Sequence, residues 1–266
     1  IGNKIKLAFP SVGATENILM ASVLAKGETK ISNAAREPEL EDLSNCLIKM
    51  GAKIEGHGTK TILVQGVTKL KKAEHEIISD RIVAGTYIIA ALMLNSALEI
   101  NNFNTIYLKS LIDILKKMGA KLKVSKNSIK VFKGSKLKSS SLSTSPYPGF
   151  PTDLQAQLMS LMCISDGKSK IKETIFENRF MHVPELNRLG ANITVEKDTA
   201  TIIGNQSFKG AQVMASDLRA SISLVLAAMN ANGQTTLNRV YHLDRGYENI
   251  EKTLGSLGAK IKRQKN

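Results

Sequence analysis

The pattern of hydrophobic and polar residues repeats four times along the 266-residue chain. Each repeat contains a segment that is apolar nearly all round, such as residues 86–94, and this predicts a helix buried on all sides. A second segment alternates apolar residues with lysines at helical spacing, as in residues 108–117, and predicts an amphipathic surface helix. The four apolar helices are expected to begin near Ala14, Ala84, Leu154 and Leu218.

A Gly-Ala turn follows the second helix of every repeat. The glycines of these turns are separated by 68, 71 and 68 residues and are Gly51, Gly119, Gly190 and Gly258. Each ends a helical pattern and precedes a short strand, as expected of a glycine just past a helix C-terminus. One such turn is weak evidence, but four at near-constant spacing indicate a repeated structural unit.

The elements of each repeat follow the order β-α-β-α-β-β. Buried helices with strands around them predict an α/β fold whose repeated units place helices inside and sheets outside. Residues 66–76 and 134–145 separate repeats and are candidate domain boundaries. The fourth repeat shows only one closing strand, near residues 259–262, so we expect an unpaired sheet edge that a segment outside this sequence fills.

The formal net charge of +14 is compatible with nucleic acid, an anionic surface or an acidic substrate as a partner. Only eight of the 37 basic residues are arginines, most lysines stand singly or in pairs, and aromatic residues make up 5% of the chain. No basic run with interleaved aromatics is present, so stacking on bases is not indicated. The composition favours a solvated lysine-rich surface with a modest bias toward anionic ligands.

Neither a membrane span nor a metal site is expected. No run of eighteen apolar residues occurs, and the two cysteines, Cys46 and Cys163, offer neither a disulfide framework nor metal-ligand spacing. These features favour a reducing cytoplasm. Since the chain begins at Ile1 with neither a methionine nor a signal-peptide pattern, we interpret its start as a cut inside a longer chain.

Ser, Thr or Asp precedes each apolar helix, in residues 10–13, 79–81, 151–154 and 216–219. One interpretation is helix capping. The other is that several helix N-termini point into one cleft and bind phosphate, with Arg81 and Arg219 as charge-assisted donors. A helix N-terminus would also keep Asp153 and Asp217 ionised, which suits a proton acceptor.

Two stretches that combine charged and aromatic residues are further candidates, residues 175–185 and 241–248. His182 and His242 occupy similar places in them and fit hydrogen-bonding, structural roles better than metal ligation. The Glu177-Asn178-Arg179 string is interpreted as a structural ion-pair corner. Arg245 is the better functional candidate, because the following glycine would let a ligand approach the backbone.

Several of these strings resemble the enolpyruvyl transferases that act on UDP-N-acetylglucosamine, and the similarity runs essentially end to end. The strings are residues 10–15, 33–39, 151–157, 176–184 and 244–248. EPSP synthase shares the repeat but not these strings. The resemblance implies an inverted α/β fold of two domains with three units each. Residues 1–70 would be the last unit of the first domain, whose rest is missing, and residues 75–266 the second domain without its final strand, which the family's N-terminal strand supplies.

The resemblance implies transfer of an enolpyruvyl group from phosphoenolpyruvate to the 3-hydroxyl of UDP-N-acetylglucosamine by addition and elimination. This is the first committed step of peptidoglycan synthesis, and so of cell wall biogenesis, with links to cell shape, cell cycle and cell division. No cofactor is implied. Because the family's lysine-asparagine pair and its loop cysteine or aspartate fall outside this sequence, the chain is expected to be inactive alone.

Site residues carry over from the resemblance one by one. Asp153 would accept the proton of the sugar hydroxyl, and Asp217 would stabilise the cationic centre or take back the C3 proton. Arg219 and Arg245 would hold phosphoenolpyruvate. The nucleotide sugar would contact the backbone of Ile175 and the residues Pro10, Ser11, Val12, Gly13 and Asp153. Phe9 stands where some members have a lysine that contacts uracil.

Two other hypotheses remain open. A relative of the same repeat fold that binds nucleic acid or processes RNA ends would suit the basic charge, but the chain lacks aromatic stacking platforms and a nucleophilic histidine motif. A fragment that keeps the fold and has no activity is the other.

Overall fold

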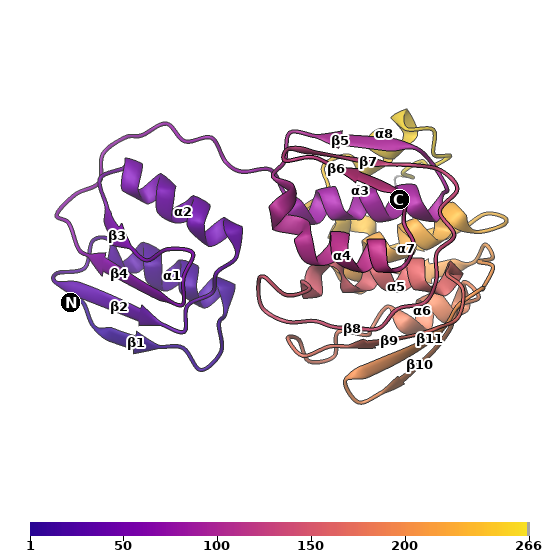
Figure 1. Cartoon of the computed structure of the whole chain (residues 1–266), viewed down its shortest axis with the longest axis horizontal. Helices are drawn as coiled ribbons and strands as arrows, with labels where there is room; N and C mark the ends of the chain where they lie inside the picture. Colours follow the sequence, from indigo (N-terminus) through magenta and orange to yellow (C-terminus); the bar gives the residue numbers. More distant parts are fainter. Residues whose placement is uncertain (265–266) are drawn as a thin grey trace. The chain divides into compact units, whose positions relative to one another are not determined.

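The computed structural model describes residues 1–264 and divides into two compact units (Figure 1). Unit 1 comprises Ile1–Ser79 together with the short segment Pro146–Gly149. Unit 2 comprises Asp80–Ser145 and the chain from Phe150 onward. Each unit has its own hydrophobic core, and each is described separately below.

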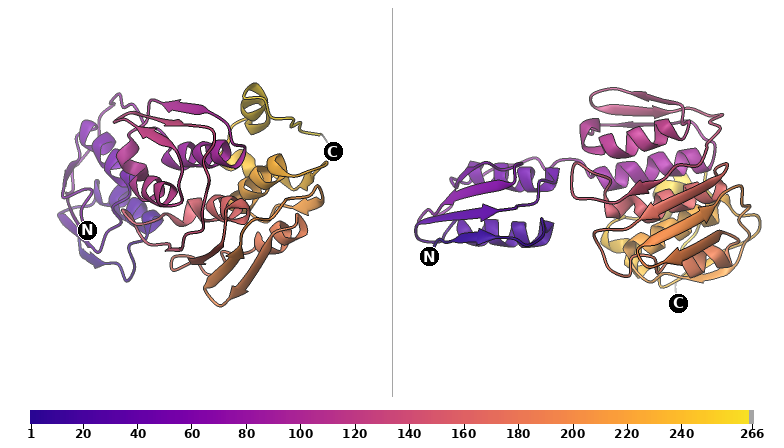
Figure 2. Two further views of the ribbon diagram at one scale, coloured as in Figure 1. Left: turned by 45° about the vertical axis from the view of Figure 1, so that its right-hand side comes forward. Right: turned by 60° about the horizontal axis from the view of Figure 1, so that its bottom comes forward.

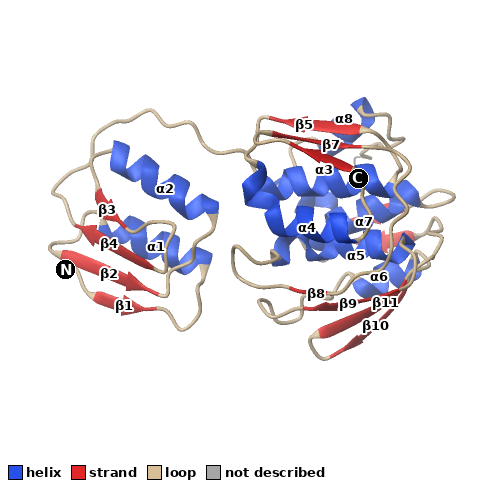
Figure 3. Ribbon diagram, in the orientation of Figure 1, coloured by secondary structure: helices blue, strands red, loops and turns tan. Residues whose placement is uncertain are grey.

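Unit 1 contains one complete β-α-β-α-β-β repeat. Its elements are β1 (Lys4–Lys6), α1 (Val12–Ser22), β2 (Glu28–Ser32), α2 (Pro38–Lys49), β3 (Lys53–Glu55) and β4 (Thr61–Gln65). The strands form one sheet in the order β1-β2-β4-β3, in which only β1 and β2 run parallel. Both helices cover the same face of this sheet (Figure 3), and Leu19, Ile31 and Ile62 are fully buried between them.

Unit 2 contains the other three repeats. The second repeat has α3 (Arg81–Met93), β5 (Leu98–Asn101), η1 (Thr105–Leu108), α4 (Lys109–Lys117), β6 (Leu122–Val124) and β7 (Ser128–Val131). The third has β8 (Leu142–Ser143), η2 (Thr152–Leu154), α5 (Gln155–Ile164), β9 (Lys168–Lys172), α6 (Val183–Arg188), β10 (Asn192–Glu196) and β11 (Thr199–Ile203). The fourth has β12 (Gln212–Met214), α7 (Leu218–Asn230), β13 (Thr236–Asn238), η3 (Val240–Arg245) and α8 (Ile250–Ser256).

Three helices, α3, α5 and α7, pack together inside unit 2, and its sheets lie outside them (Figures 2 and 3). Eleven residues of α3 and nine of α5 are buried, so these helices have no polar face to present to water. Gly85 permits the close approach of α3 to its neighbours, since a Cβ there would lie 2.8 Å from the Leu154 side chain. The predicted α/β fold with buried helices and outer sheets is confirmed.

The prediction of an all-round buried helix is wrong for α1. Only Thr15, Leu19 and Ser22 of α1 are buried, and Met20 is 46% exposed. The reason lies in the number of repeats in each unit. In unit 1 a single repeat packs α1 against α2 and the sheet, whereas in unit 2 each apolar helix also contacts the apolar helices of the neighbouring repeats.

The Gly-Ala turns have the predicted conformation in all four repeats. Their glycines have φ between +97° and +102° and follow the second helix of each repeat: Gly51, Gly119, Gly190 and Gly258. A side chain would be strained in this left-handed region. The turn after the first helix of the second repeat uses Asn95 at φ 47° where the other repeats have glycine, because asparagine tolerates this region better than most residues.

Two predicted strands, one in the second repeat and one in the fourth, are missing within residues 1–264. Residues 259–264 form no strand, and neither do residues 70–80 before α3. In the first three repeats the third strand pairs only with the fourth, as β3 does with β4. The fourth repeat has no fourth strand within residues 1–264, so residues 259–262 have no ladder to join, and the expected closing strand was a wrong prediction.

Candidate active site

Residues 10–13 lie in unit 1 at the start of α1. Ser11 caps this helix, because its side-chain oxygen accepts the Ala14 N–H at 3.3 Å. Pro10, Ser11 and Val12 are half-buried and Gly13 is exposed, with open space where a Cβ would stand. The capping interpretation therefore holds for Ser11, while the first-turn backbone beside it remains accessible.

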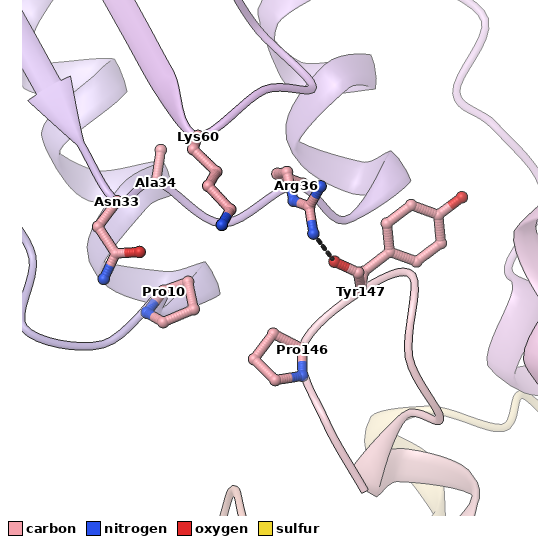
Figure 4. Close-up of a pocket in the computed structure, with 7 residues that line it drawn as sticks. All are labelled: Pro10, Asn33, Ala34, Arg36, Lys60, Pro146 and Tyr147. Atoms are coloured by element: carbon pink, nitrogen blue, oxygen red, sulfur yellow. Dashed lines mark hydrogen bonds between the residues drawn. The ribbon is translucent and has the colours of Figure 1, made fainter.

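A pocket of about 220 Å³ lies beside Pro10 and is also lined by Asn33, Ala34, Arg36, Lys60, Pro146 and Tyr147 (Figure 4). One guanidinium nitrogen of Arg36 donates to the Tyr147 carbonyl at 3.0 Å. Lys60 is exposed and has no ion pair within the described residues. The lining thus contains two cationic side chains and no acidic one, which suits an anionic group.

In unit 2, Asp153 lies between two arginines from different segments. Its Oδ1 atom accepts Arg219 Nε at 2.9 Å and Arg179 Nη2 at 2.8 Å. The side chains of the two arginines are 18% and 16% exposed, and that of Asp153 is 41% exposed. Its Oδ2 atom makes no hydrogen bond to residues 1–264 and so remains open to a ligand.

Asp153 does not cap its helix, contrary to the capping interpretation. It lies inside the 3-10 turn η2, whose N-cap is Pro151, and no side chain caps this turn. Burial alone would raise the pKa of the Asp153 carboxyl, but the charges of Arg219 and Arg179 and the Arg219 hydrogen bond lower it below its ordinary value. The arginines, rather than a helix N-terminus, keep this carboxylate ionised.

Asp217 caps α7, so here the capping interpretation holds. Its Oδ1 atom accepts the backbone N–H groups of Arg219 at 2.8 Å and Ala220 at 3.0 Å, and the Ser216 hydroxyl lies 3.1 Å from Oδ2. Burial would raise the pKa of Asp217, but these hydrogen bonds and the charge of Arg179 lower it. The same residue therefore orders the turn that carries Arg219.

Arg245 ends the turn η3 and is exposed, and its guanidinium has no partner within residues 1–264. The expectation that Gly246 lets a ligand approach the backbone stays a prediction. A Cβ at Gly246 would lie 2.9 Å from the Leu218 side chain, so the missing side chain serves the packing of this turn on α7. The structure thus leaves Arg245 available to an anion but does not hold it against Asp153.

Ile175 is half-buried and follows β9. Its backbone N–H donates to the carboxylate of Glu173 at 2.8 Å. The backbone group that remains at Ile175 for a substrate is therefore its carbonyl, which can only accept.

His182 is 2% exposed, and burial lowers its pKa to about 4, with opposing influences from Asp217 and Arg179. A buried neutral imidazole fits the structural role expected of it. No group of three or more His, Cys, Asp or Glu side chains in residues 1–264 is arranged to hold a metal ion. None of the helices in that range combines the length and apolar character of a membrane span.

Sequence reasoning did not assign Arg179 or Tyr247 to the site. Arg179 was interpreted as part of an ion-pair corner, and its partner proves to be Asp153, 26 positions away. Tyr247 is 3% exposed and joins Thr86 and Gln157 in a buried hydrogen-bonded group. Both residues lie in the two stretches of mixed charged and aromatic residues, and that composition was the available signal.

The family of the chain follows from comparison with known sequences. Residues 2–254 match the family model described as EPSP synthase (3-phosphoshikimate 1-carboxyvinyltransferase). This match covers nearly the whole chain, and the chain belongs to this family of enolpyruvyl transferases.

The sequence relatives include proteins named UDP-N-acetylglucosamine 1-carboxyvinyltransferase. The one from Pelagibacter ubique is 52% identical over 99% of this chain, and the one from Endomicrobium trichonymphae is 54% identical over 98%. The chain spans 63% and 62% of the lengths of these two relatives. The predicted family resemblance is confirmed.

Solved structures show the same fold. The enolpyruvyl transferase NikO from Streptomyces tendae superposes with a TM-score of 0.89 at 27% identity, over 97% of this chain and 64% of that one. An EPSP synthase from Acinetobacter baumannii gives a TM-score of 0.77 at 19% identity, over 99% and 64%. The second similarity concerns the fold alone.

Proposed function

We propose that the protein containing this chain transfers the enolpyruvyl group of phosphoenolpyruvate to the 3-hydroxyl of UDP-N-acetylglucosamine and releases inorganic phosphate. The observation that carries the proposal is the environment of Asp153. One carboxylate oxygen is held by Arg219 and Arg179, and the other is open to a ligand. The names of relatives at 52–54% identity support this choice of substrates.

The chemistry has two stages. In the addition, the sugar hydroxyl oxygen bonds to C2 of phosphoenolpyruvate, the hydroxyl gives up its proton, and C3 receives a proton. In the elimination, C3 loses a proton and the bond from C2 to the phosphate oxygen breaks. A base for the hydroxyl and cationic donors for the phosphate and carboxylate are therefore needed.

The residues of unit 2 would divide these tasks. Asp153 Oδ2 would accept the hydroxyl proton while the arginines hold the carboxylate in orientation. Asp217 would stabilise the cationic enolpyruvyl centre or take back the C3 proton. Arg219 and Arg245 would bind phosphoenolpyruvate, and Arg219 would then divide its five N–H donors between Asp153 and this ligand.

The residues of unit 1 would bind the nucleotide. The backbone of Pro10, Ser11, Val12 and Gly13 would contact the uridine diphosphate part, and the basic pocket beside Pro10 would favour its negative charge. The carbonyl of Ile175, in unit 2, would accept a hydrogen bond from the sugar, since the N–H of the same residue is already bound.

We further propose that this reaction is the first committed step of peptidoglycan synthesis in the cytoplasm, with its links to cell shape, cell cycle and cell division. Neither nucleic acid nor a membrane would be a partner. Residues 1–70 would form one repeat of a first domain. Residues 75–266 would form a three-repeat second domain that a strand from outside this sequence completes.

The test uses a protein of the relatives' full length that contains residues 1–266. Phosphate release and the mass of the product are measured with both substrates, for the parent, for Asp153→Asn and for Asp198→Asn. The second variant is a control, because Asp198 is an exposed aspartate. Loss of the base should lower kcat by about two to four powers of ten in Asp153→Asn only.

Melting temperature and phosphoenolpyruvate affinity are measured on the same proteins, because the change also removes the negative partner of two arginines. Turnover of Asp153→Asn within a few-fold of the parent would refute the role of Asp153. A parent that forms no enolpyruvyl product would refute the proposed function itself.

A further inference from the structure

Glu173 directly follows β9 and is 5% exposed, and its carboxylate accepts four hydrogen bonds. Its Oε1 atom accepts the Thr144 hydroxyl at 2.8 Å and the N–H groups of Ile175 at 2.8 Å and Phe176 at 3.2 Å. Its Oε2 atom accepts the Thr152 hydroxyl at 3.0 Å. Burying a carboxylate is costly unless donors surround it, and this one has donors on both oxygens.

The other three repeats give an internal comparison for this position. The residue directly after the second strand is Asn33, Asn102 or Arg239 there, and each has a left-handed backbone, with φ of 57°, 62° and 58°. In the first repeat the Asn33 amide donates to the Leu7 carbonyl at 3.0 Å.

Thr144 occupies the place of Leu7 in the third repeat, because each donates its backbone N–H to the last residue of the second strand. In the first repeat, the asparagine side chain connects the residues that follow two neighbouring strands. In the third repeat, the Glu173 carboxylate makes the corresponding contact with Thr144 and also contacts other segments. Glu173 also contacts Thr152, Ile175 and Phe176, and the Asn33 side chain makes no equivalent contacts within residues 1–264.

Two of these contacts, with Thr152 and Ile175, fall on the candidate site. Thr152 directly precedes Asp153, and Ile175 supplies the backbone carbonyl that the proposed function assigns to the sugar. Oε2 therefore fixes the turn that presents the base, and Oε1 fixes the segment that presents the carbonyl. One buried side chain sets the spacing between the two groups.

We propose that Glu173 is a positioning residue for the acceptor sugar, which holds Asp153 and the Ile175 carbonyl in the arrangement that binds the reacting hydroxyl. The proposal rests on the proposed function. It concerns the nucleotide sugar and not phosphoenolpyruvate, because none of the four contacts involves Arg219 or Arg245.

The first experiment measures KM for each substrate and kcat in the full-length protein with Glu173→Gln and with Thr152→Val. Glutamine has an NH2 group in place of one oxygen, so it cannot accept on both sides. Valine removes only the Oε2 contact, from a half-buried residue, and so keeps the test valid if Glu173→Gln does not fold. We expect KM for UDP-N-acetylglucosamine to rise about tenfold or more, the result of losing roughly one hydrogen bond to a charged group. KM for phosphoenolpyruvate should stay within about twofold.

Two controls accompany these variants. Thr152→Ser keeps the hydroxyl and should behave as the parent, and Glu196→Gln changes an exposed glutamate of β10 and should have no effect. Unchanged KM for the nucleotide sugar in Thr152→Val, or an equal rise for both substrates, would overturn the proposal.

A second measurement does not depend on activity. Amide hydrogen exchange at Ile175 and Phe176 is compared in residues 1–266 with and without Glu173→Gln, and exchange should become faster in the variant. If the parent proves inactive while exchange increases as expected, the proposed function fails but the positioning of this segment by Glu173 stands. Unchanged exchange would refute that positioning.

Discussion

The hydroxyl groups of Thr86 and Tyr247 lie 2.8 Å apart in the interior of unit 2, although 161 positions separate the two residues. Gln157 joins them, since its amide nitrogen donates to the Thr86 hydroxyl at 3.2 Å and to the Asp153 carbonyl at 2.9 Å. These buried hydrogen bonds therefore connect α3, α5 and the turn after η3. The last of them is made to the backbone carbonyl of Asp153, the candidate base.

Removing one hydroxyl of this pair should cost stability. In Tyr247→Phe the Thr86 hydroxyl loses a partner in a buried setting, and we expect the free energy of unfolding to fall by about 1–3 kcal/mol. The measurement is urea denaturation of residues 1–266. Tyr87→Phe is the matched control, because Tyr87 is the next residue along α3 and is only half-buried.

A double-mutant cycle with Thr86→Val separates the pair from its surroundings. If the two hydroxyls interact, the loss in the double variant should be smaller than the sum of the single losses by about 0.5 kcal/mol or more. Strict additivity would mean that the 2.8 Å contact carries no net stabilisation.

Arg245 should be needed for phosphoenolpyruvate but not for stability. In the full-length protein, Arg245→Lys keeps the charge and loses the planar two-donor grip on a carboxylate or phosphate. We expect phosphoenolpyruvate affinity to fall about tenfold or more while affinity for the nucleotide sugar and the melting temperature stay unchanged. Calorimetric titration with each substrate checks this.

The control for that substitution is Arg188→Lys, since the Arg188 side chain is 61% exposed and pairs with Glu185, three positions earlier in α6. Equal losses toward both substrates, or a lower melting temperature, would indicate that Arg245 has a structural role instead.

The sequence was informative about the repeat because the repeat is local. Gly51 and its three equivalents could be recognised from the residues around them, and so could the buried character of α3 and α5. The exposed face of α1 could not, because burial depends on which helices share a unit. The same limit explains Asp153, whose arginine partners come from positions 26 and 66 residues away.

The buried position of Glu173 could not be predicted for a related reason. A glutamate next to lysines at the end of a strand fits an exposed residue, and its burial depends on hydroxyls from two other segments. The misassigned closing strand near residue 260 shows the converse. Its local pattern was suitable, but a strand needs a neighbour with free N–H and C=O groups.

Acid should destabilise the chain through His182. Its pKa in the folded state is about 4, below the ordinary value of 6.5, so between these values the unfolded chain binds a proton that the folded chain does not. The contribution of the neutral His182 to the free energy of unfolding is therefore fully present above about pH 6.5. It is lost as the pH falls toward about 4, and the loss is at most about 3 kcal/mol. Urea denaturation at several pH values measures this slope.

The variant His182→Asn should have a flatter profile of unfolding free energy between pH 4.5 and 6.5 than the parent. The pKa can also be measured directly from the NMR shifts of the imidazole. A titration midpoint of His182 near 6.5 in the folded protein would contradict the prediction.

The outer edge of β13 should behave as an unpaired strand. In the first three repeats the second strand pairs with the fourth, as β2 does with β4 and β9 with β11, but β13 has only β12 beside it within residues 1–264. Thr236 donates its N–H toward β12, to the Ala211 carbonyl. Successive N–H groups of a strand point to opposite sides, so that of Leu237 points to the open edge.

Amide hydrogen exchange in residues 1–266 tests this with three internal controls. The residues equivalent to Leu237 are Ile31, Ile100 and Ile171, which stand opposite Ile62, Ile129 and Ala200 of a paired strand. We expect exchange at Leu237 to be faster than at all three by about a hundredfold or more, because its N–H has no partner in the sheet. A peptide of about eight residues that can add an antiparallel strand should slow this exchange, and the same peptide with N-methylated pairing positions should not. Protection of Leu237 equal to that of Ile171 in the chain alone would mean that the edge is already covered from within the chain, and that the fourth repeat needs no strand from outside.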